Sequence, residues 1–231
     1  AEHFGAIEGA SIDANKGAYS SAWMIIFGVI AAIMVLIGIY HIKMLPSTQV
    51  PSTTKKTASE VGHELVAVIA NFFTKKHILY YICFIILYRL AEGFIMKIAP
   101  LFLRASRDVG GLGLSLTEIG TLNGIFGSAA FVLGSLLAGI YVSKFGLKKT
   151  LFTLCCIFNL PFVAYTFLAV AQPTNVYLIG TCITMEYFGY GFGFVGLTLF
   201  MMQQIAPGKH QMSHYAFASG IMNLGVMFPG M

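Results

Sequence analysis

The stretch ILYYICFIILYRLAEGFIMKIAP, residues 78–100, decides the fold class of this chain. As a helix with a rise of about 1.5 Å per residue, it is long and apolar enough to cross the roughly 30 Å hydrocarbon core of a bilayer. Arg89, Glu92 and Lys97 nevertheless lie inside it. One charge at the centre of a membrane helix costs about 2.5–3.5 kcal/mol. We therefore expect one face of this helix to meet protein, water or a partner charge rather than lipid.

The composition of the whole chain indicates that its solvent is lipid. Of 231 residues, 57% are hydrophobic and only 10% are charged, whereas about 25% of residues are charged in soluble domains. The net charge of +5 does not indicate nucleic-acid binding, because the lysines cluster beside the ends of the apolar blocks, as loop anchors of membrane helices do. The four cysteines all fall inside apolar blocks, so we expect reduced thiols and no metal site.

Long continuous apolar blocks predict an all-α membrane protein, a polytopic bundle of transmembrane helices rather than a β-barrel. About twenty helical residues span the hydrocarbon core. By that measure six spans are predicted, at residues 22–42, 78–103, 117–143, 151–171, 176–203 and 214–231.

The basic residues between these spans orient the bundle. Nine of them lie on one side of the membrane, within 43–77, 144–149 and at Lys209, against Lys16, Arg104 and Arg107 on the other. The side richer in lysine is cytoplasmic by the positive-inside rule. We therefore expect the long basic loop 44–77 in the cytoplasm.

That loop divides into two parts. Residues 44–56 form a polar, proline-containing linker. Residues 57–76 open with the capping-box pair Thr57 and Glu60 and continue with apolar residues at helical spacing, which predicts an amphipathic helix on the cytoplasmic membrane face. The alternative is that they simply begin the next span.

The chain is thus predicted to comprise an outer segment with the first span (1–43), the linker (44–77) and a helix bundle (78–231). It does not begin with Met, and its last apolar block is short. We expect it to be a piece of a longer protein.

Glycines recur inside two of the predicted spans. Gly191, Gly193 and Gly196 form a G-x-G-x-x-G pattern, but a dinucleotide site would require a preceding strand. Inside a membrane span, small residues instead let helices approach closely, so we expect packing contacts here. The same expectation applies to a small-residue stripe in the third span, at Gly120, Gly124, Gly127, Ser128 and Gly134.

Opposite charges lie at one depth in two spans. Arg89 is eleven residues into its span and shares a helix face with Glu92, while Glu186 is about ten residues from the outer end of the fifth span. One interpretation is a structural salt bridge that orients two helices. The other is a water-filled pathway, in which Arg89 or Lys97 holds an anion and Glu92 or Glu186 titrates.

Three segments carry a family resemblance. The loop GIYVSKFGLKKT, residues 139–150, resembles the G-x-x-x-D-R-x-G-R-[RK] loop of the major facilitator superfamily, with Ser143 in place of the usual acidic residue. The stretches LYRLAEGFIMKIAPLFL and GLGLSLTEIGTLNGIFG resemble the AmpG-type muropeptide permease branch of that superfamily, with Arg89 and Glu92 in place of a Lys and an Asp.

The resemblance implies that the chain runs from the sixth to the eleventh helix of such a transporter, with the missing N-terminal half of the same protein as a partner. Residues 44–77 then link the two halves, and the spans with Arg89 and Glu186 line a central cavity. The implied function is a secondary transporter of the bacterial inner membrane. It imports a hydrophilic anionic solute such as a muropeptide by alternating access coupled to protons, without a cofactor.

The same resemblance suggests roles for residues. Arg89 and Lys97 would contact the solute, and Glu92 and Glu186 would carry protons. Tyr88, Tyr187 and Tyr190 would stack or hydrogen-bond along the cavity, with packing or interface anchoring as the alternative. A conformational gating loop would comprise Gly139, Lys144, Gly146, Lys148 and Lys149.

Two other classes of membrane protein are alternatives to a transporter. A membrane-embedded enzyme would need a metal or nucleophile constellation inside the spans, and the sequence displays none. A structural or partner-binding membrane subunit, in which the buried charges only hold helices together, stays open. Asn123 and Asn159 are expected to hydrogen-bond between helices.

Overall fold

A computed structural model describes residues 13–44, 57–159 and 161–230 of the chain. These residues are helical or lie in short connections, and no strand occurs among them. The chain divides into two compact units, Ala1–Lys56 and Thr57–Met231. The described part of the first unit contains helix α1 (Lys16–Met44), which has no buried side chain and is long and apolar enough to cross a membrane.

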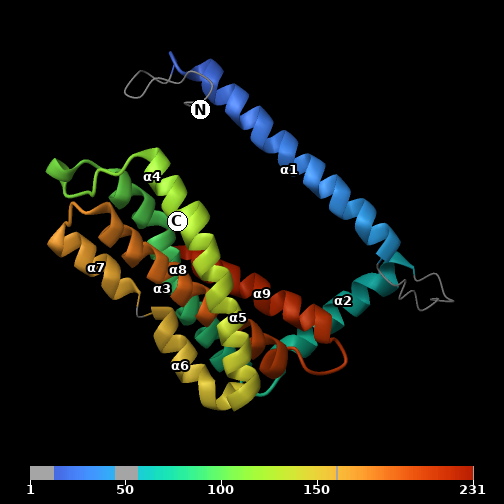
Figure 1. Cartoon of the computed structure of the whole chain (residues 1–231). Helices are drawn as coiled ribbons and strands as arrows, with labels where there is room; N and C mark the ends of the chain where they lie inside the picture. The colour runs from blue at the N-terminus through green and yellow to red at the C-terminus, as the bar shows by residue number, and fades with distance from the viewer. Residues whose placement is uncertain (1–12, 45–56, 160, 231) are drawn as a thin grey trace. The chain divides into compact units, whose positions relative to one another are not determined.

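The second unit contains the helix bundle (Figure 1). Its helices are α2 (Ala58–Phe73), α3 (Ile78–Arg104), α4 (Leu116–Thr121), α5 (Ser128–Phe145), α6 (Leu147–Asn159), α7 (Phe162–Ala171), α8 (Val176–Phe200) and α9 (Gln211–Met227). Two π-helical segments continue neighbouring helices, η3 (Leu122–Gly127) between α4 and α5 and η4 (Met201–Ile205) after α8. Short 3-10 turns, η2 (Arg107–Val109) and η5 (Phe228–Gly230), follow α3 and α9.

Four described helices have the length and apolarity of a membrane span. They are Lys16–Met44, Ile78–Arg104, Leu116–Phe145 and Leu147–Ala171. The fifth predicted span is the continuous 25-residue helix α8, which is not among those four. The sixth is helix α9, of 17 residues. Four of the six predicted spans therefore correspond to described segments that could cross a membrane, and the fifth and sixth spans stay predictions.

The fourth predicted span is broken near its middle. Helix α6 ends at Asn159, and α7 begins after Pro161, which occupies its N-cap position. A proline ring fits the start of a helix but removes a hydrogen bond from a helix interior. The span predicted over residues 151–171 thus comprises the two helices α6 and α7.

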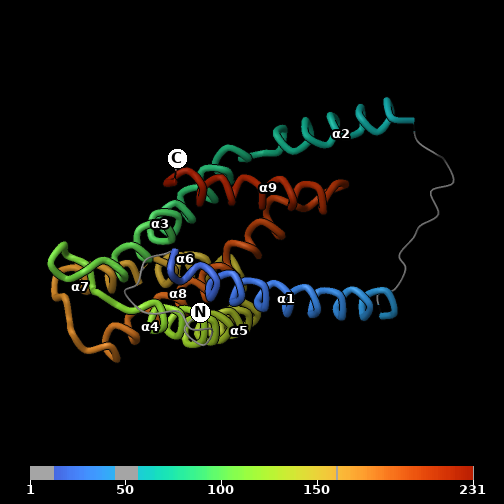
Figure 2. Tube along the Cα trace, turned by 90° about the horizontal axis from the view of Figure 1, so that it is seen from above, coloured from blue at the N-terminus to red at the C-terminus, as the bar shows by residue number. Residues whose placement is uncertain are grey.

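Helix α8 packs between α5 and α6, with its glycines at the contacts (Figures 1 and 2). A Cβ added at Gly191 would lie 2.1 Å from the carbonyl oxygen of Phe131 in α5. One added at Gly193 would lie 2.4 Å from Cβ of Phe158 in α6. The predicted close approach of helices at this glycine-rich stretch is therefore confirmed.

The small-residue stripe of the third span is only partly a packing surface. A Cβ at Gly127 would meet the ring of Tyr187 at 2.9 Å, and one at Gly134 would meet the carbonyl oxygen of Phe188 at 2.3 Å. At Gly120 and Gly124 an added Cβ meets nothing within 4 Å in the described part of the chain. The packing expectation is wrong for those two glycines among the described residues.

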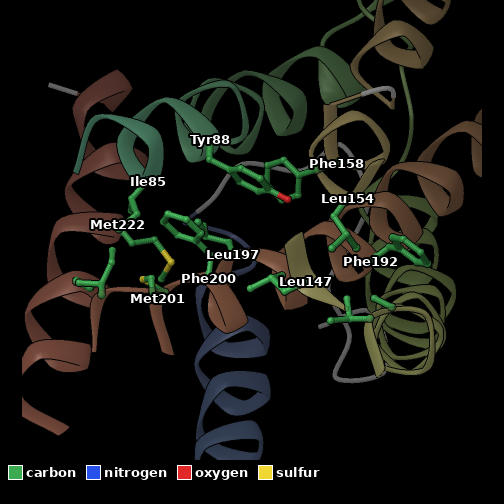
Figure 3. Packing of buried hydrophobic residues seen from close by; sticks show 14 of the residues in the cluster. Ile85, Tyr88, Leu147, Leu154, Phe158, Phe192, Leu197, Phe200, Met201 and Met222 are labelled. Atoms are coloured by element: carbon green, nitrogen blue, oxygen red, sulfur yellow. The ribbon is translucent and has the colours of Figure 1, made fainter. Parts of the chain in front are cut away.

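Buried side chains form two clusters along the bundle. The larger cluster surrounds the C-terminal half of α8 and includes Leu154, Phe158, Leu197 and Phe200 (Figure 3). The smaller one, with Leu103, lies near the C-terminal end of α3 and the N-terminal half of α8; its remaining buried members are Leu112, Leu114, Leu122, Leu168, Ile179 and Ile183.

The connection after α3 folds back on the C-terminal end of that helix. The amide of Leu114 donates to the carbonyl oxygen of Leu103 at 2.9 Å. The two terminal guanidinium nitrogens of Arg107 donate to the carbonyl oxygens of Gln172 and Pro173, at 3.0 and 2.9 Å. The α3–α4 and α7–α8 connections are therefore joined to one another.

The glycine contacts predict a large difference between two alanine substitutions. Gly191→Ala forces a methyl group against the backbone of α5, and overpacking of this kind costs about 1–3 kcal/mol. Gly124→Ala, with open space at its Cβ, serves as the matched control and is expected to be neutral or slightly stabilising. Thermal unfolding of the purified chain in detergent measures both. Equal melting temperatures for the two variants would contradict the packing assignment.

Candidate mid-membrane charge site

Arg89 and Glu92 form an ion pair within helix α3. Their spacing of three residues places both on one helix face. Nε of Arg89 lies 2.6 Å from Oε2 of Glu92, and Nη2 of Arg89 lies 2.7 Å from Oε1. Arg89 is 5% and Glu92 3% exposed. One hydrogen bond, from Nη2 to Oε1, and one close charge contact, between Nε and Oε2, thus join the two side chains, and this pairing lets both charges be buried.

Neighbouring helices cover the arginine. Its Cζ atom lies 5.3 Å from the ring centroid of Phe194 and 5.8 Å from that of Tyr190, both in α8. Its Nη1 atom lies 3.6 Å from the sulfur of Met222 in α9. A guanidinium facing aromatic rings gains a cation–π attraction, which is stronger where water is excluded. Side chains from α8 and α9 therefore cover the guanidinium group of Arg89.

Glu186 lies in α8, one helical turn before Tyr190, and is 9% exposed. Within the described ranges its carboxylate takes part in no ion pair. The groups that interact with it electrostatically are Glu92 of α3, Tyr165 of α7 and its own neighbour Tyr187. The arginine at this depth is therefore paired within α3, and Glu186 stands beside that pair as a second buried carboxyl group.

Tyr88 joins α3 to α8 on an adjacent face. Its hydroxyl donates a hydrogen bond of 2.8 Å to the carbonyl oxygen of Gly193. Its ring centroid lies 4.7 Å from that of Phe158, and Figure 3 shows the two rings side by side. From α5, Ser135 donates a hydrogen bond of 3.1 Å to the carbonyl oxygen of Gly191. The sequence contained no signal for the Ser135 contact beyond a small polar residue within a span.

Two predicted solute contacts lie apart from the ion pair. The ring of Tyr187 packs over Gly127 of η3. Lys97 is exposed, and its side chain lies beside Gly230 in the turn after α9. The structure thus brings Arg89, Glu92 and Tyr190 together, and Glu186 lies nearby. Tyr187 and Lys97 lie apart from this group.

The predicted gating loop covers the end of α5, the start of α6 and the single residue between them, Gly146. Gly146 has a φ of +79°, a left-handed conformation that glycine adopts without strain, and its amide closes the end of α5 on the carbonyl oxygen of Val142. Lys144 lies with Nζ 5.5 Å from the ring centroid of Phe145. Lys148 and Lys149 are exposed at the start of α6, and a Cβ at Gly139 would meet open space.

The two asparagines in spans behave differently from expectation. Nδ2 of Asn159 donates 2.9 Å to the carbonyl oxygen of Cys155 in its own helix, so the expected bond between helices is wrong there. Oδ1 of Asn123, in the π-helical segment η3, is buried without a hydrogen-bond partner among the described residues. All four cysteines are free thiols.

The fold and the site define a helical membrane protein with an ion pair and an additional carboxyl group buried at mid-span. The Major Facilitator Superfamily model matches residues 4–231, so the chain belongs to that family. It is similar to the anhydromuropeptide permeases of Escherichia coli strain K12 and of Escherichia coli O157:H7. Each is 22% identical over 180 residues, which cover 78% of this chain and 35% of the relative. The chain therefore spans about a third of the length of the curated relatives that it matches. No solved structure matches it significantly.

The ion pair predicts a non-additive pattern of stability. Arg89→Ala leaves Glu92 buried without its partner, and breaking a buried pair in this way costs about 3–5 kcal/mol. The double change Arg89→Met with Glu92→Leu removes both charges and should recover most of that loss. Thermal unfolding in detergent measures the two variants.

Lys97→Ala is the matched control for Arg89→Ala, since it removes an exposed cation from the same helix. It should leave the melting temperature nearly unchanged. If Arg89→Ala is no more damaging than Lys97→Ala, the pair does not stabilise the bundle.

Proposed function

We propose that the chain is part of a secondary active transporter that imports a hydrophilic anionic solute, coupled to protons, by alternating access. A muropeptide derived from the cell wall is the solute class we favour. The support is membership of the Major Facilitator Superfamily together with the similarity to two anhydromuropeptide permeases. Both findings favour transport over catalysis.

The observation that carries the proton part of the proposal is that Glu186 forms no ion pair with any residue that the structure describes. Arg89 is paired with Glu92 through one hydrogen bond and a close charge contact. With both carboxylates ionised, the three charges therefore sum to −1. A buried carboxylate without a partner is costly, and uptake of a proton removes that cost. Glu186 is thus the better candidate for the coupling proton, and Glu92 carries one only when it releases Arg89.

The solute part of the proposal follows from the same pair. Arg89 is enclosed by Glu92, Tyr190 and Phe194, so an anionic group reaches it by taking the place of the Glu92 carboxylate. In this proposal Lys97 attracts the anion first, because it is exposed two turns further along α3. Tyr88 and Tyr187 would shape the path through their packing against α8 and η3.

The remaining parts of the proposal concern topology. An N-terminal half of the same transporter would complete the cavity, and the loop 44–77 would link the two halves. That loop and the α5–α6 connection, with Lys144, Lys148 and Lys149, would face the cytoplasm of a bacterium. Alternating access would come from the two halves rocking about a site at mid-membrane.

One observation favours the alternative of a structural or partner-binding membrane subunit. The ion pair is satisfied within α3 and covered by rings from α8, as a purely structural pair would be. Under that alternative, apolar replacements at Arg89 and Glu186 that keep the fold also keep any partner complex.

Uptake by the full-length protein in proteoliposomes, driven by an imposed pH gradient, tests the proposal. Glu186→Gln mimics a permanently protonated side chain, so concentrative uptake should fall by about tenfold or more and lose its dependence on pH. Glu118→Gln is the matched control, since Glu118 is a half-buried carboxylate outside the charge site that caps α4 through Ser115.

The outcomes separate the hypotheses. Wild-type uptake with an unchanged pH profile in Glu186→Gln would rule out the proton assignment. Normal uptake in a folded Arg89→Ala variant would rule out the solute contact. A screen of radiolabelled muropeptides, sugars and nucleotides identifies the solute class.

A further inference from the structure

Helix α2 is a separate element before the membrane helix α3. It begins after Thr57, whose amide donates 2.8 Å to Oε2 of Glu60, and the predicted capping box is confirmed. It ends at Phe73, and the chain turns through His77, which has a φ of +64°, before α3 begins. The alternative that these residues simply begin the next span is therefore wrong.

One edge of α2 is fixed to α9. Val68 and Phe72 are buried, and the ring of Phe72 lies 5.7 Å from the rings of both His214 and Phe217. Nε2 of His214 lies 3.4 Å from the carbonyl oxygen of Val68. Figures 1 and 2 both place α2 beside α9. These contacts fix the rotation of α2 about its own axis.

The connection after α2 is also fixed. The ammonium group of Lys75 donates to the carbonyl oxygens of Ile205 and Pro207, at the end of the π-helical segment that follows α8. The end of α2 is therefore held against α9 and against the end of α8, within the same unit.

A second apolar edge of α2 has no partner among the described residues. Leu65, Ile69 and Phe73 recur at intervals of four, next to the docked edge, and are 56%, 40% and 55% exposed. Val61 and Val66 extend this apolar stripe and are exposed too. The opposite face is polar and includes Glu60 and Glu64. An apolar stripe of this width on a charged helix is typical of a helix that lies in a membrane interface.

The position of α2 relative to α3 indicates what covers this stripe. Only four residues separate Phe73 from Ile78, where a membrane-spanning helix begins. The first turn of α3 exposes Leu79 and Tyr80, as a helix does where it enters lipid. Since the connection is so short, the end of α2 lies at the depth of the lipid headgroups.

The charge at this end of the unit favours anionic lipid. Lys76 follows the stripe directly and is exposed. Residues from the starts of α3 and α6 and the ends of α5 and η4 share one core cluster here, so their flanking lysines surround the same end. Those exposed lysines are Lys144, Lys148, Lys149 and Lys209. Lysines near an anionic membrane surface are attracted to it electrostatically.

We infer that α2 is an interfacial helix that inserts Leu65, Ile69 and Phe73 into the surface of an anionic bilayer while Val68 and Phe72 dock on α9. The two edges hold α9 at a fixed depth relative to the headgroups. This lipid contact is independent of the solute and of the proton proposed for the mid-membrane site.

Tryptophan fluorescence tests the contact. Trp23 is the only tryptophan of the chain, so Trp23→Phe provides a silent background. Into it, Phe73→Trp places the probe in the stripe, and Ala67→Trp places a matched probe on the exposed polar side of the same helix. Both proteins are reconstituted in vesicles of phosphatidylcholine and phosphatidylglycerol with brominated acyl chains. We expect strong quenching of the probe at 73 and at least about threefold weaker quenching at 67.

The lipid charge is tested by the same readout. In vesicles of phosphatidylcholine alone, or after Lys76→Ala in mixed vesicles, quenching of the probe at 73 should decrease. Equal quenching in both vesicle types would overturn the preference for anionic lipid. A probe at 73 that bromine does not quench would overturn the membrane contact, and iodide then shows whether water or protein covers the stripe.

Discussion

The requirement that a buried arginine keep a partner is the constraint on which the described bundle depends. In α3 this requirement is met within one helix, since Glu92 holds Arg89 at 2.6 and 2.7 Å. The pair still has to be shielded from lipid, and Tyr190, Phe194 and Met222 do so. Helices α8 and α9 must therefore approach α3 on the face that carries the charges. Without that approach the pair would lie in hydrocarbon, where charge is most expensive.

Close packing of α8 makes this approach possible. Its glycines allow α5 and α6 to lie within backbone contact, as the position of Phe131 beside Gly191 shows. The hydrogen bonds of Tyr88 and Ser135 to carbonyl oxygens of Gly193 and Gly191 then tie α8 to α3 and α5. Lipid supplies little hydrophobic force between helices, so packing and such polar contacts supply most of the association. The glycines and the charge pair thus depend on the same placement of α8.

The sequence contained enough to predict the helices, the capping box at Thr57 and the burial of Arg89 and Glu92, because these features depend on composition and local spacing. It did not predict which partner Arg89 takes. Glu186 has a similar depth, but the rotation of α8 about its axis decides whether Glu186, Tyr187 or Tyr190 faces α3, and that rotation depends on contacts with α5 and α6. For the same reason the packing expected at Gly120 and Gly124 is absent among the described residues. The sequence pattern shows where small residues occur, but only the fold shows which atoms they contact.

An ion pair within one helix also has a mechanical consequence. Had Arg89 paired with Glu186, any separation of α3 from α8 would have parted two buried charges, at a cost of about 3–5 kcal/mol. With the pair contained in α3, the helices can shift while Arg89 remains neutralised, and only weaker cation–π, sulfur and van der Waals contacts are lost. The electrostatic environment of Glu186 then changes, because its neighbours Glu92 and Tyr165 lie on other helices. The arrangement therefore suits a protein whose helices move past one another while a single carboxyl group responds to that movement.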